Sequence, residues 1–323
     1  MPWLQVSFDI AQEQAELIEA ALENAGALAV TLGDAGDEPQ LEPPPGSMPL
    51  WQGVRLTALF EDDAEARTKV EALAAALAPQ ALAPPRIEQV ADRAWERVWL
   101  DEFAPARFGR RLWVCPRGQM PDPVQTGPDT VVVALDPGLA FGTGHHATTA
   151  LCLEWLDAAD LANKTMLDYG CGSGILAIAA LRLGAARAIA VDHDPQALEA
   201  TRANALENGV ADRLQVLLPE ALGPIQADVL IANILAQPLV DLAPRLTDLV
   251  APGGALALSG ILQDQVARVA AAYGAGFDLF PPRVLEDWAL IAGRRRDPRR
   301  ASGIAGGEDR GRPSGPGSRG REG

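Results

Sequence analysis

Three glycines at alternate positions follow a carboxylate near the middle of the chain. An apolar run ends in Asp168, and Gly170, Gly172 and Gly174 come directly after it. Glycine lets the backbone adopt positive φ and approach a ligand closely, and the helix expected from about Ile175 begins with unbonded N–H groups. The pattern predicts a strand–turn–helix unit that binds a nucleotide or a nucleoside.

A second carboxylate, Asp192, ends the next apolar run. In nucleotide-binding βαβ units, an acid at this place accepts hydrogen bonds from a ribose diol. Two details favour S-adenosylmethionine over NAD. Position 175 holds Ile where the dinucleotide fingerprint has its third glycine, and Asp168 suits the α-ammonium of a methionyl group better than a pyrophosphate. A purely structural turn in another doubly wound sheet is the alternative.

A tetrad of Asn233, Ile234, Leu235 and Ala236 follows a further apolar run. The side-chain carbonyl of Asn233 and the backbone carbonyls after it can accept hydrogen bonds from an amine and orient its lone pair. Methyl transfer from a sulfonium needs in-line approach of a neutral nucleophile, so positioning is the main catalytic contribution. We therefore expect Asn233 and Ile234 to be catalytic, with Asn233 also touching the cofactor. The alternative is that Asn233 only caps a turn.

Residues 136–149 (DPGLAFGTGHHATT) form a second dense segment, with glycines and with hydroxyls at the expected start of a helix. Thr149 can cap that helix or contact the methionyl part of the cofactor. Phe141 can form a wall beside it. We therefore expect both Phe141 and Thr149 to be cofactor-binding residues.

The histidines and cysteines form no recognisable metal pattern. His145 and His146 are adjacent, which rarely suits chelation of one ion, and His193 is the only other histidine. The cysteines (Cys115, Cys152 and Cys171) are odd in number and lack CxxC spacing, as expected in a reducing cytoplasm. We expect no metal, no signal peptide and no membrane span, hence a cytoplasmic protein.

The charge is strongly negative and unevenly distributed. The formal net charge is −16 at pH 7. Residues 1–90 hold 15 acidic and 4 basic residues, whereas residues 294–323 hold nine arginines and four acids. An acidic body disfavours a nucleic-acid substrate and favours a basic protein or a cationic small molecule. General solubility explains the charge equally well.

The first 90 residues predict a small α+β domain with the order βαββαβ, typical of ferredoxin-like folds. Strands are expected over 3–8, 27–32, 50–60 and 86–90, and helices over 11–24 and after Asp62 or Asp63. This segment contains no catalytic constellation, so we expect it to recognise the substrate. Residues 91–105, with Trp95 and Trp99 one helical turn apart, are expected to form a helical linker.

Residues 106–293 predict an α/β, Rossmann-like doubly wound sheet, whose ligands lie at the carboxyl edge of its strands. Strands are expected over 110–116, 131–136, 165–169, 187–191, 214–218, 228–232, 255–259, 277–280 and 287–292. Helices are expected over 147–158, 175–183, 194–209, 238–250 and 261–273. The Arg- and Gly-rich tail, 294–323, has too few apolar residues to fold and is expected to be disordered.

Taken together, these segments resemble the ribosomal protein L11 methyltransferase family over residues 1–293. The resemblance rests on WERVWLDEF, RFGRRLWVCP, DPGLAFGTG, LDYGCGSGILAIAALRLGA, VDHDPQAL and the NILA tetrad. It implies a class I methyltransferase domain that transfers methyl groups from S-adenosylmethionine to lysine ε-amines and the N-terminal α-amine of ribosomal protein L11. The cofactor contacts that it implies are Thr149, Gly170, Asp192 and Asn233; Asp168, Gly172 and Phe141 complete the expected set.

The chain departs from the family pattern at three positions. His145 replaces a Thr, Ala147 replaces a Pro, and His193 stands beside the ribose-binding acid where an aliphatic residue is usual.

Three alternative functions stay open: methylation of RNA or a small amine, an NAD-linked oxidoreductase, and a non-enzymatic cofactor-binding or ribosome-assembly module. The acidic N-terminal segment argues against RNA, and Ile175 and Asp168 argue against NAD. We expect a monomer.

Overall fold

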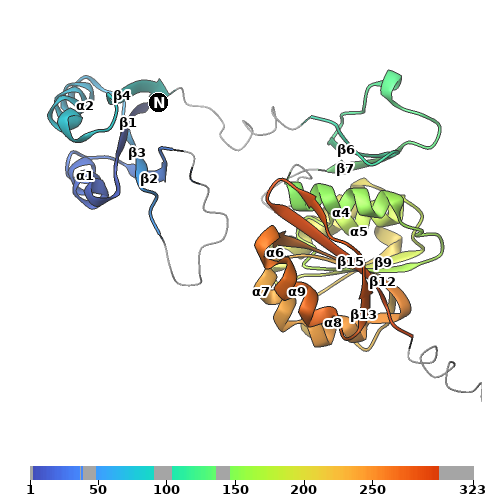
Figure 1. Cartoon of the computed structure of the whole chain (residues 1–323). Helices are drawn as coiled ribbons and strands as arrows, with labels where there is room; N and C mark the ends of the chain where they lie inside the picture. Colours follow the sequence, from blue (N-terminus) through green and yellow to red (C-terminus); the bar gives the residue numbers. More distant parts are fainter. Residues whose placement is uncertain (1–2, 37, 39–48, 91–103, 136–145, 298–323) are drawn as a thin grey trace, which may run out of the picture. The chain divides into compact units, whose positions relative to one another are not determined.

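The computed structural model describes residues 3–36, 38, 49–90, 104–135 and 146–297 (Figure 1). The chain divides into two compact units, residues 1–99 and 100–323. Phe141, His145 and the expected linker helix with its two tryptophans lie outside the described residues, as does the tail from residue 298.

The first unit is an antiparallel sheet covered on one face by two helices. Its strands β1 (Trp3–Ala11), β2 (Ala29–Asp34), β3 (Gly53–Glu61) and β4 (Arg86–Val90) lie in the order β2-β3-β1-β4. Every second residue of β1 and β3 is buried, and these side chains pack against α1 (Ala15–Asn24) and α2 (Ala64–Leu77). This alternation produces the ferredoxin-like fold expected from the sequence.

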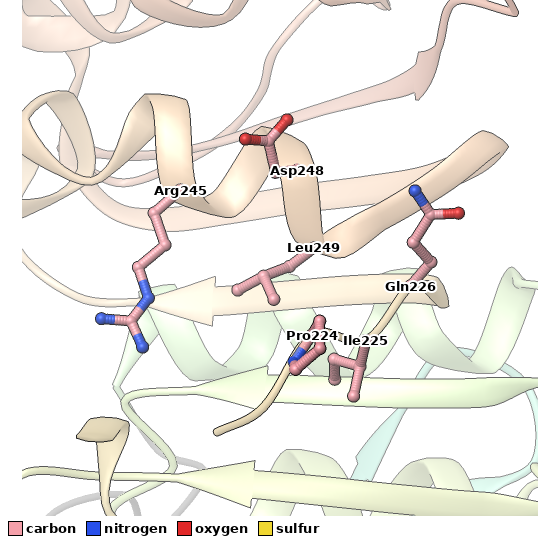
Figure 2. A pocket seen from close by; sticks show the side chains of 6 residues that line it. All are labelled: Pro224, Ile225, Gln226, Arg245, Asp248 and Leu249. Atoms are coloured by element: carbon pink, nitrogen blue, oxygen red, sulfur yellow. The ribbon is translucent and has the colours of Figure 1, made fainter. Parts of the chain in front are cut away.

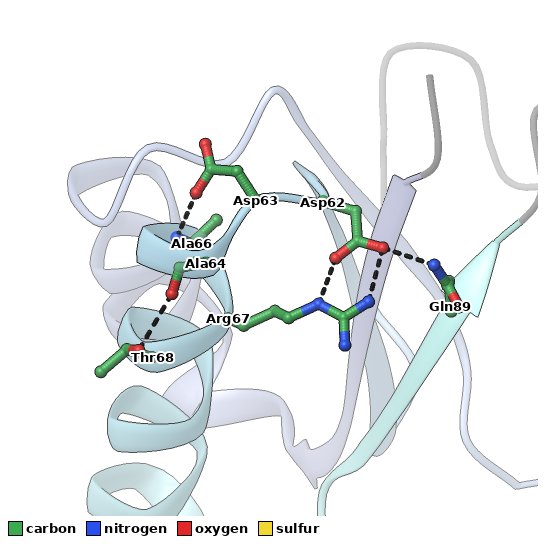
Figure 3. A network of polar contacts seen from close by, with 7 residues as sticks. All are labelled: Asp62, Asp63, Ala64, Ala66, Arg67, Thr68 and Gln89. Carbon is green, nitrogen blue, oxygen red and sulfur yellow. Dashed lines mark hydrogen bonds and ion pairs between the residues drawn. The ribbon is translucent and has the colours of Figure 1, made fainter.

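Two neighbouring acids at the start of α2, Asp62 and Asp63, make different hydrogen bonds (Figure 3). The Asp63 carboxylate caps the helix by accepting the Ala66 N–H at 2.7 Å. Asp62 instead accepts from the Arg67 guanidinium, at 2.7 Å for Nη2, and from Nε2 of Gln89 at 2.6 Å. Since Gln89 lies in β4, Asp62 joins the first turn of α2 to an edge strand of the sheet.

The second unit is built on a mixed sheet in the order β10-β9-β8-β11-β12-β15-β13. The five parallel strands are β8 (Thr165–Tyr169), β9 (Arg187–Val191), β10 (Leu214–Leu217), β11 (Ala227–Asn233) and β12 (Val250–Leu262). β15 (Trp288–Arg295) runs antiparallel beside β12, β13 (Phe277–Leu279) and β14 (Arg283–Leu285). The strand order reverses at β8, which makes its carboxyl end the expected ligand crevice.

Helices cover both faces of this sheet. Met166 and Ile231 point to the face that holds α4 (Ala147–Ala158), α5 (Ile175–Arg182) and α6 (Pro195–Glu207). Leu167 and Leu230 point to the opposite face, under α7 (Ala236–Asp241), α8 (Ala243–Leu249) and α9 (Val266–Tyr273). Figure 1 shows α4 and α5 on one side of the strands and α7, α8 and α9 on the other. None of the helices in the described part of the chain is long and apolar enough to cross a bilayer.

A small separate sheet lies at the start of the second unit in sequence and packs on the α4 and α5 side of its core. It contains β5 (Ala106–Phe108), β6 (Leu112–Pro116) and β7 (Val131–Leu135), with β6 parallel to β7. β6 and β7 were expected from the sequence, whereas the short strands β5 and β14 were not.

The single helix expected over 238–250 is wrong. Two helices, α7 and α8, meet at Leu242. Pro244 lies in the first turn of α8, where its missing N–H needs no partner. Inside one continuous helix the same proline would remove a hydrogen bond and clash with the preceding turn.

The expected boundaries are also wrong at the far end of the sheet. The helix expected from residue 261 begins at Val266, because Ile261 and Leu262 still pair with β15. β15 itself continues to Arg295, so the sheet ends two residues beyond the expected limit at 293. The pairing of Arg294 and Arg295 with β13 accounts for this extension.

Candidate cofactor and active site

The turn from β8 into α5 has left-handed backbone at all three of its glycines. The φ angles are 82°, 53° and 78° at Gly170, Gly172 and Gly174. The Gly170 N–H donates to the Val191 carbonyl at 2.7 Å, which fastens the turn to β9. A Cβ on Gly170 would collide with the Cγ2 atom of Ile234, so only glycine permits this approach. The structure therefore brings two of the expected site residues, Gly170 and Ile234, into contact.

Asp192 lies directly against the same turn, at the end of β9. Its side chain is largely buried, and its Oδ2 atom accepts the Gly172 N–H at 2.9 Å. Its Oδ1 atom accepts the Asp194 N–H at 3.0 Å and lies 3.4 Å from Nδ1 of His193. The expected pair of Gly172 and Asp192 is thus joined by a hydrogen bond, with a carboxylate at the rim of the turn.

Asp168 is a fully buried carboxylate at the end of β8. Its Oδ2 atom accepts the Ala177 N–H at 3.1 Å, whereas its Oδ1 atom has no hydrogen-bond partner among the described residues. Burial raises the pKa of Asp168 to about 7, with repulsion from Asp192 adding to the rise and the Ala177 hydrogen bond opposing it. A buried carboxylate with one unused oxygen fits a cationic ligand group.

Asn233 reaches from the end of β11 to the first turn of α4. Its Nδ2 atom donates to Oγ1 of the buried Thr149 at 3.2 Å. α4 is capped by His146, whose Nδ1 atom accepts the Thr148 N–H at 3.4 Å and whose ring packs edge-on against Trp288. The expected residues Asn233 and Thr149 therefore meet, and His146 has a structural partner on each side.

A buried polar stripe on α6 and just beyond its end also holds the site together. Oγ1 of Thr201 donates to the Gly172 carbonyl, and Nδ2 of Asn204 donates to the Ser173 carbonyl, each at 2.9 Å. Nδ2 of Asn208 donates to the Ala134 carbonyl of β7 at 2.6 Å. We did not single out these residues from the sequence. Their spacing of three and four positions on a helix of otherwise apolar inner residues was the available signal.

Cys171 packs beside this stripe. Its Sγ atom lies 3.5 Å from Oγ1 of Thr201, and burial raises the pKa of the thiol far above its usual value. A thiol that stays protonated is a poor nucleophile, so Cys171 acts here as a small packing residue.

A groove of about 640 Å³ lies elsewhere, at the amino end of β11 (Figure 2). It is lined by Pro224, Ile225, Gln226, Arg245, Asp248 and Leu249. Arg245 donates to the Pro219 carbonyl and Asp248 faces Arg295 at 3.6 Å, so both charged side chains already have partners. The groove contains none of the expected site residues and lies at the opposite strand end from them.

The doubly wound sheet, the glycine turn between two carboxylates and the amide at the end of β11 define a Rossmann-like methyltransferase that uses S-adenosylmethionine. The model of the family "Ribosomal protein L11 methyltransferase (PrmA)" matches residues 2–296. The chain belongs to this family. The resemblance, the fold class and the cofactor expected from the sequence are thereby confirmed.

Individual relatives agree with this assignment. A ribosomal protein L11 methyltransferase of Pseudomonas aeruginosa is 56% identical over 297 residues, which cover 92% of this chain and 99% of the relative. The corresponding protein of Nitrosococcus oceani is 51% identical over 296 residues, covering 92% and 100%. The crystal structure of a ribosomal protein L11 methylase from Lactobacillus delbrueckii subsp. bulgaricus is 30% identical, with a TM-score of 0.54, and covers 60% of this chain and 99% of that one.

Replacing Asp192 by alanine tests its expected role at the ribose. Asp192→Ala removes a charged acceptor, worth roughly 1.5–3 kcal/mol, so S-adenosylmethionine affinity measured by calorimetry should fall about 10- to 150-fold. Asp194→Ala is the matched control: it removes the same charge two residues away, where the carboxylate caps α6. The control should lower the melting temperature and leave the affinity within about twofold. Equal affinities of Asp192→Ala and the wild type would contradict the assignment.

The pH dependence of cofactor binding tests Asp168. Its raised pKa means that the carboxyl group is charged above about pH 7 and neutral below it. The α-ammonium of the cofactor stays charged below pH 7, so its attraction to Asp168 is lost as the pH falls. Affinity should weaken about 15-fold from pH 7 to pH 5.5, at most tenfold per pH unit. Asp168→Asn should bind weakly at both pH values, and a variant that kept the full pH dependence would exclude Asp168.

Proposed function

We propose that this chain transfers methyl groups from S-adenosylmethionine to ribosomal protein L11, on lysine ε-amines and on the N-terminal α-amine. The observation that carries the proposal is the placement of Asn233 at the end of β11, directly before the Ile234 side chain that contacts the glycine turn. Its side-chain amide donates to Thr149, which leaves the side-chain carbonyl to accept from an amine. The curated relatives named above carry L11 as their substrate in their names, which supports the choice of partner.

The described residues fit the cofactor. The unpartnered Oδ1 atom of Asp168 suits the α-ammonium, and Asp192 suits the ribose diol. Positive φ at Gly170 and Gly172 lets the backbone of the turn approach the ligand closely, and Thr149 and Asn233 are proposed as further contacts. Phe141 stays a prediction. When bound, the cofactor supplies a methyl group on a sulfonium, and the protein supplies position and a surrounding of hydrogen-bond acceptors.

The acceptor amine must be neutral when it attacks. A lysine amine with a pKa of about 10.4 loses its proton at pH 7 at a cost of about 4.6 kcal/mol, and an α-amine near 8 at about 1.4 kcal/mol. The tetrad offers the carbonyls of Asn233 and Ile234 as acceptors, and its four residues include no carboxylate or imidazole. We infer that deprotonation precedes attack and that these carbonyls orient the lone pair.

The acidic N-terminal unit is proposed to recognise this basic partner. Three of the four basic residues before position 91 are already held in ion pairs, Arg55 with Asp9, Arg67 with Asp62 and Lys69 with Glu65. The remaining acids outnumber the remaining base, which favours a basic protein and disfavours RNA. We further propose that the chain acts as a monomer, in the cytoplasm where ribosomes are assembled.

Methyl transfer from labelled S-adenosylmethionine to purified L11 tests the proposal. The wild type should label L11, and Asn233→Ala should lower kcat at least tenfold while cofactor affinity changes much less, because the lost contact orients the nucleophile.

Lysine labelling should rise from pH 7 to 9, and α-amine labelling should level off about two pH units earlier than lysine labelling. Added salt should raise KM for L11 through screening of the acidic unit.

Gln237→Ala is the matched control for the Asn233 variant. Gln237 is an exposed amide four residues further on, and its side chain bonds to Asp241 within α7. This variant should keep the wild-type kcat. Labelling of ribosomal RNA in place of L11 would contradict the proposed substrate, and a normal kcat in Asn233→Ala would remove that residue from the catalytic set.

A further inference from the structure

β12 contains a bulge where it passes the catalytic tetrad. Leu258 pairs with Ile291 of β15, and Ile261 pairs with Ala289. Between these two pairs β12 advances three residues while β15 advances two. Two residues of β12, Ser259 and Gly260, therefore lie opposite a single residue of β15. Bulges of this kind occur beside active sites, where they redirect the chain. On its other side the bulge pairs with the tetrad, since Ser259 is in register with Asn233 of β11.

Gly260 brings the bulge into contact with the backbone of Ile234. Its φ is 80°, and a Cβ built on it would lie 2.8 Å from the carbonyl carbon and 3.1 Å from the nitrogen of Ile234, with the carbonyl oxygen closer still. All three atoms belong to the main chain and cannot turn aside as a side-chain end can. The position of the Ile234 carbonyl therefore depends on the absence of a side chain at Gly260.

Ser259 connects the bulge to the other wall of the site. Its fully buried Oγ atom lies 3.2 Å from the carbonyl of Thr148 in α4 and 3.2 Å from the carbonyl of Ala289 in β15. Thr148 precedes Thr149, which accepts the Asn233 amide. One hydroxyl thus ties the first turn of α4 to the bulge that supports Ile234.

We propose that Ser259 and Gly260 are positioning residues for methyl transfer: the bulge fixes the direction of the Ile234 carbonyl and holds Asn233 and Thr149 at one spacing. This inference rests on the proposed function, in which Asn233 and Ile234 orient the acceptor amine. The bulge reaches the cofactor site only through Ile234, Asn233 and Thr149, whereas Asp168 and Asp192 make no described hydrogen bond to it. Disturbing the bulge should therefore affect the orientation of the amine more than cofactor binding.

A pair of glycine variants in the same strand separates positioning from backbone strain. Gly260→Ala should lower kcat for L11 at least tenfold and change the affinity for S-adenosylmethionine by no more than about threefold. Gly253→Ala is the control, because Gly253 also lies in β12 with φ of 77°, and a Cβ there meets nothing within 4 Å. It introduces the same left-handed strain without touching the tetrad, so its kcat should stay within twofold of the wild type.

Similar losses of kcat in both glycine variants, or a normal kcat in Gly260→Ala, would overturn the proposal. If Gly260→Ala does not fold, Ser259→Ala tests it instead, since this variant leaves the backbone unobstructed. It should lower kcat about fivefold at unchanged KM for L11, and an unchanged kcat would refute the positioning role. Wild-type and Asn233→Ala reactions run alongside show whether the proposed function itself has failed.

Discussion

Close approach of the glycine turn to neighbouring side chains is the constraint on which this site depends. At the carboxyl edge of the sheet, Gly170 meets Ile234 and Gly174 meets Thr201, in each case at a separation that leaves no room for a Cβ. The Gly172 N–H then reaches the Asp192 carboxylate at 2.9 Å. Because these segments come from β8, β11, α6 and β9, a single side chain in the turn would separate several parts of the site together.

Burial of Asp168 follows from the same close packing. The carboxylate lies beneath the turn with one oxygen satisfied by Ala177 and the other without a described partner. Such a group destabilises the unliganded protein when it is charged, and the destabilisation is relieved when a cation binds. The fold therefore holds an incomplete ion pair at the place where the methionyl ammonium is expected, which couples affinity to the charge of Asp168.

Much of this arrangement was predictable from local sequence signals. The bounds of β8, β9 and α4 agree with expectation, because glycines and short polar segments mark their ends. Three features were not predictable. Pro244 divides a helix, the Ser259–Gly260 bulge lengthens β12, and the α6 stripe binds carbonyls far away in sequence. The bulge and the stripe depend on partners that only the folded chain brings near, and Pro244 was compatible with either a break or a kink.

The mass of ribosomal protein L11 in cells that lack this chain tests the central claim most directly. The proposed function makes the carboxyl edge of the sheet the site of methyl transfer to that protein. L11 from such cells should be lighter by whole multiples of one methylene, with its lysines and its N-terminus unmodified, and the wild-type chain should restore the mass. An L11 mass that is the same with and without the chain, or a loss of methyl groups from ribosomal RNA instead, would contradict the account.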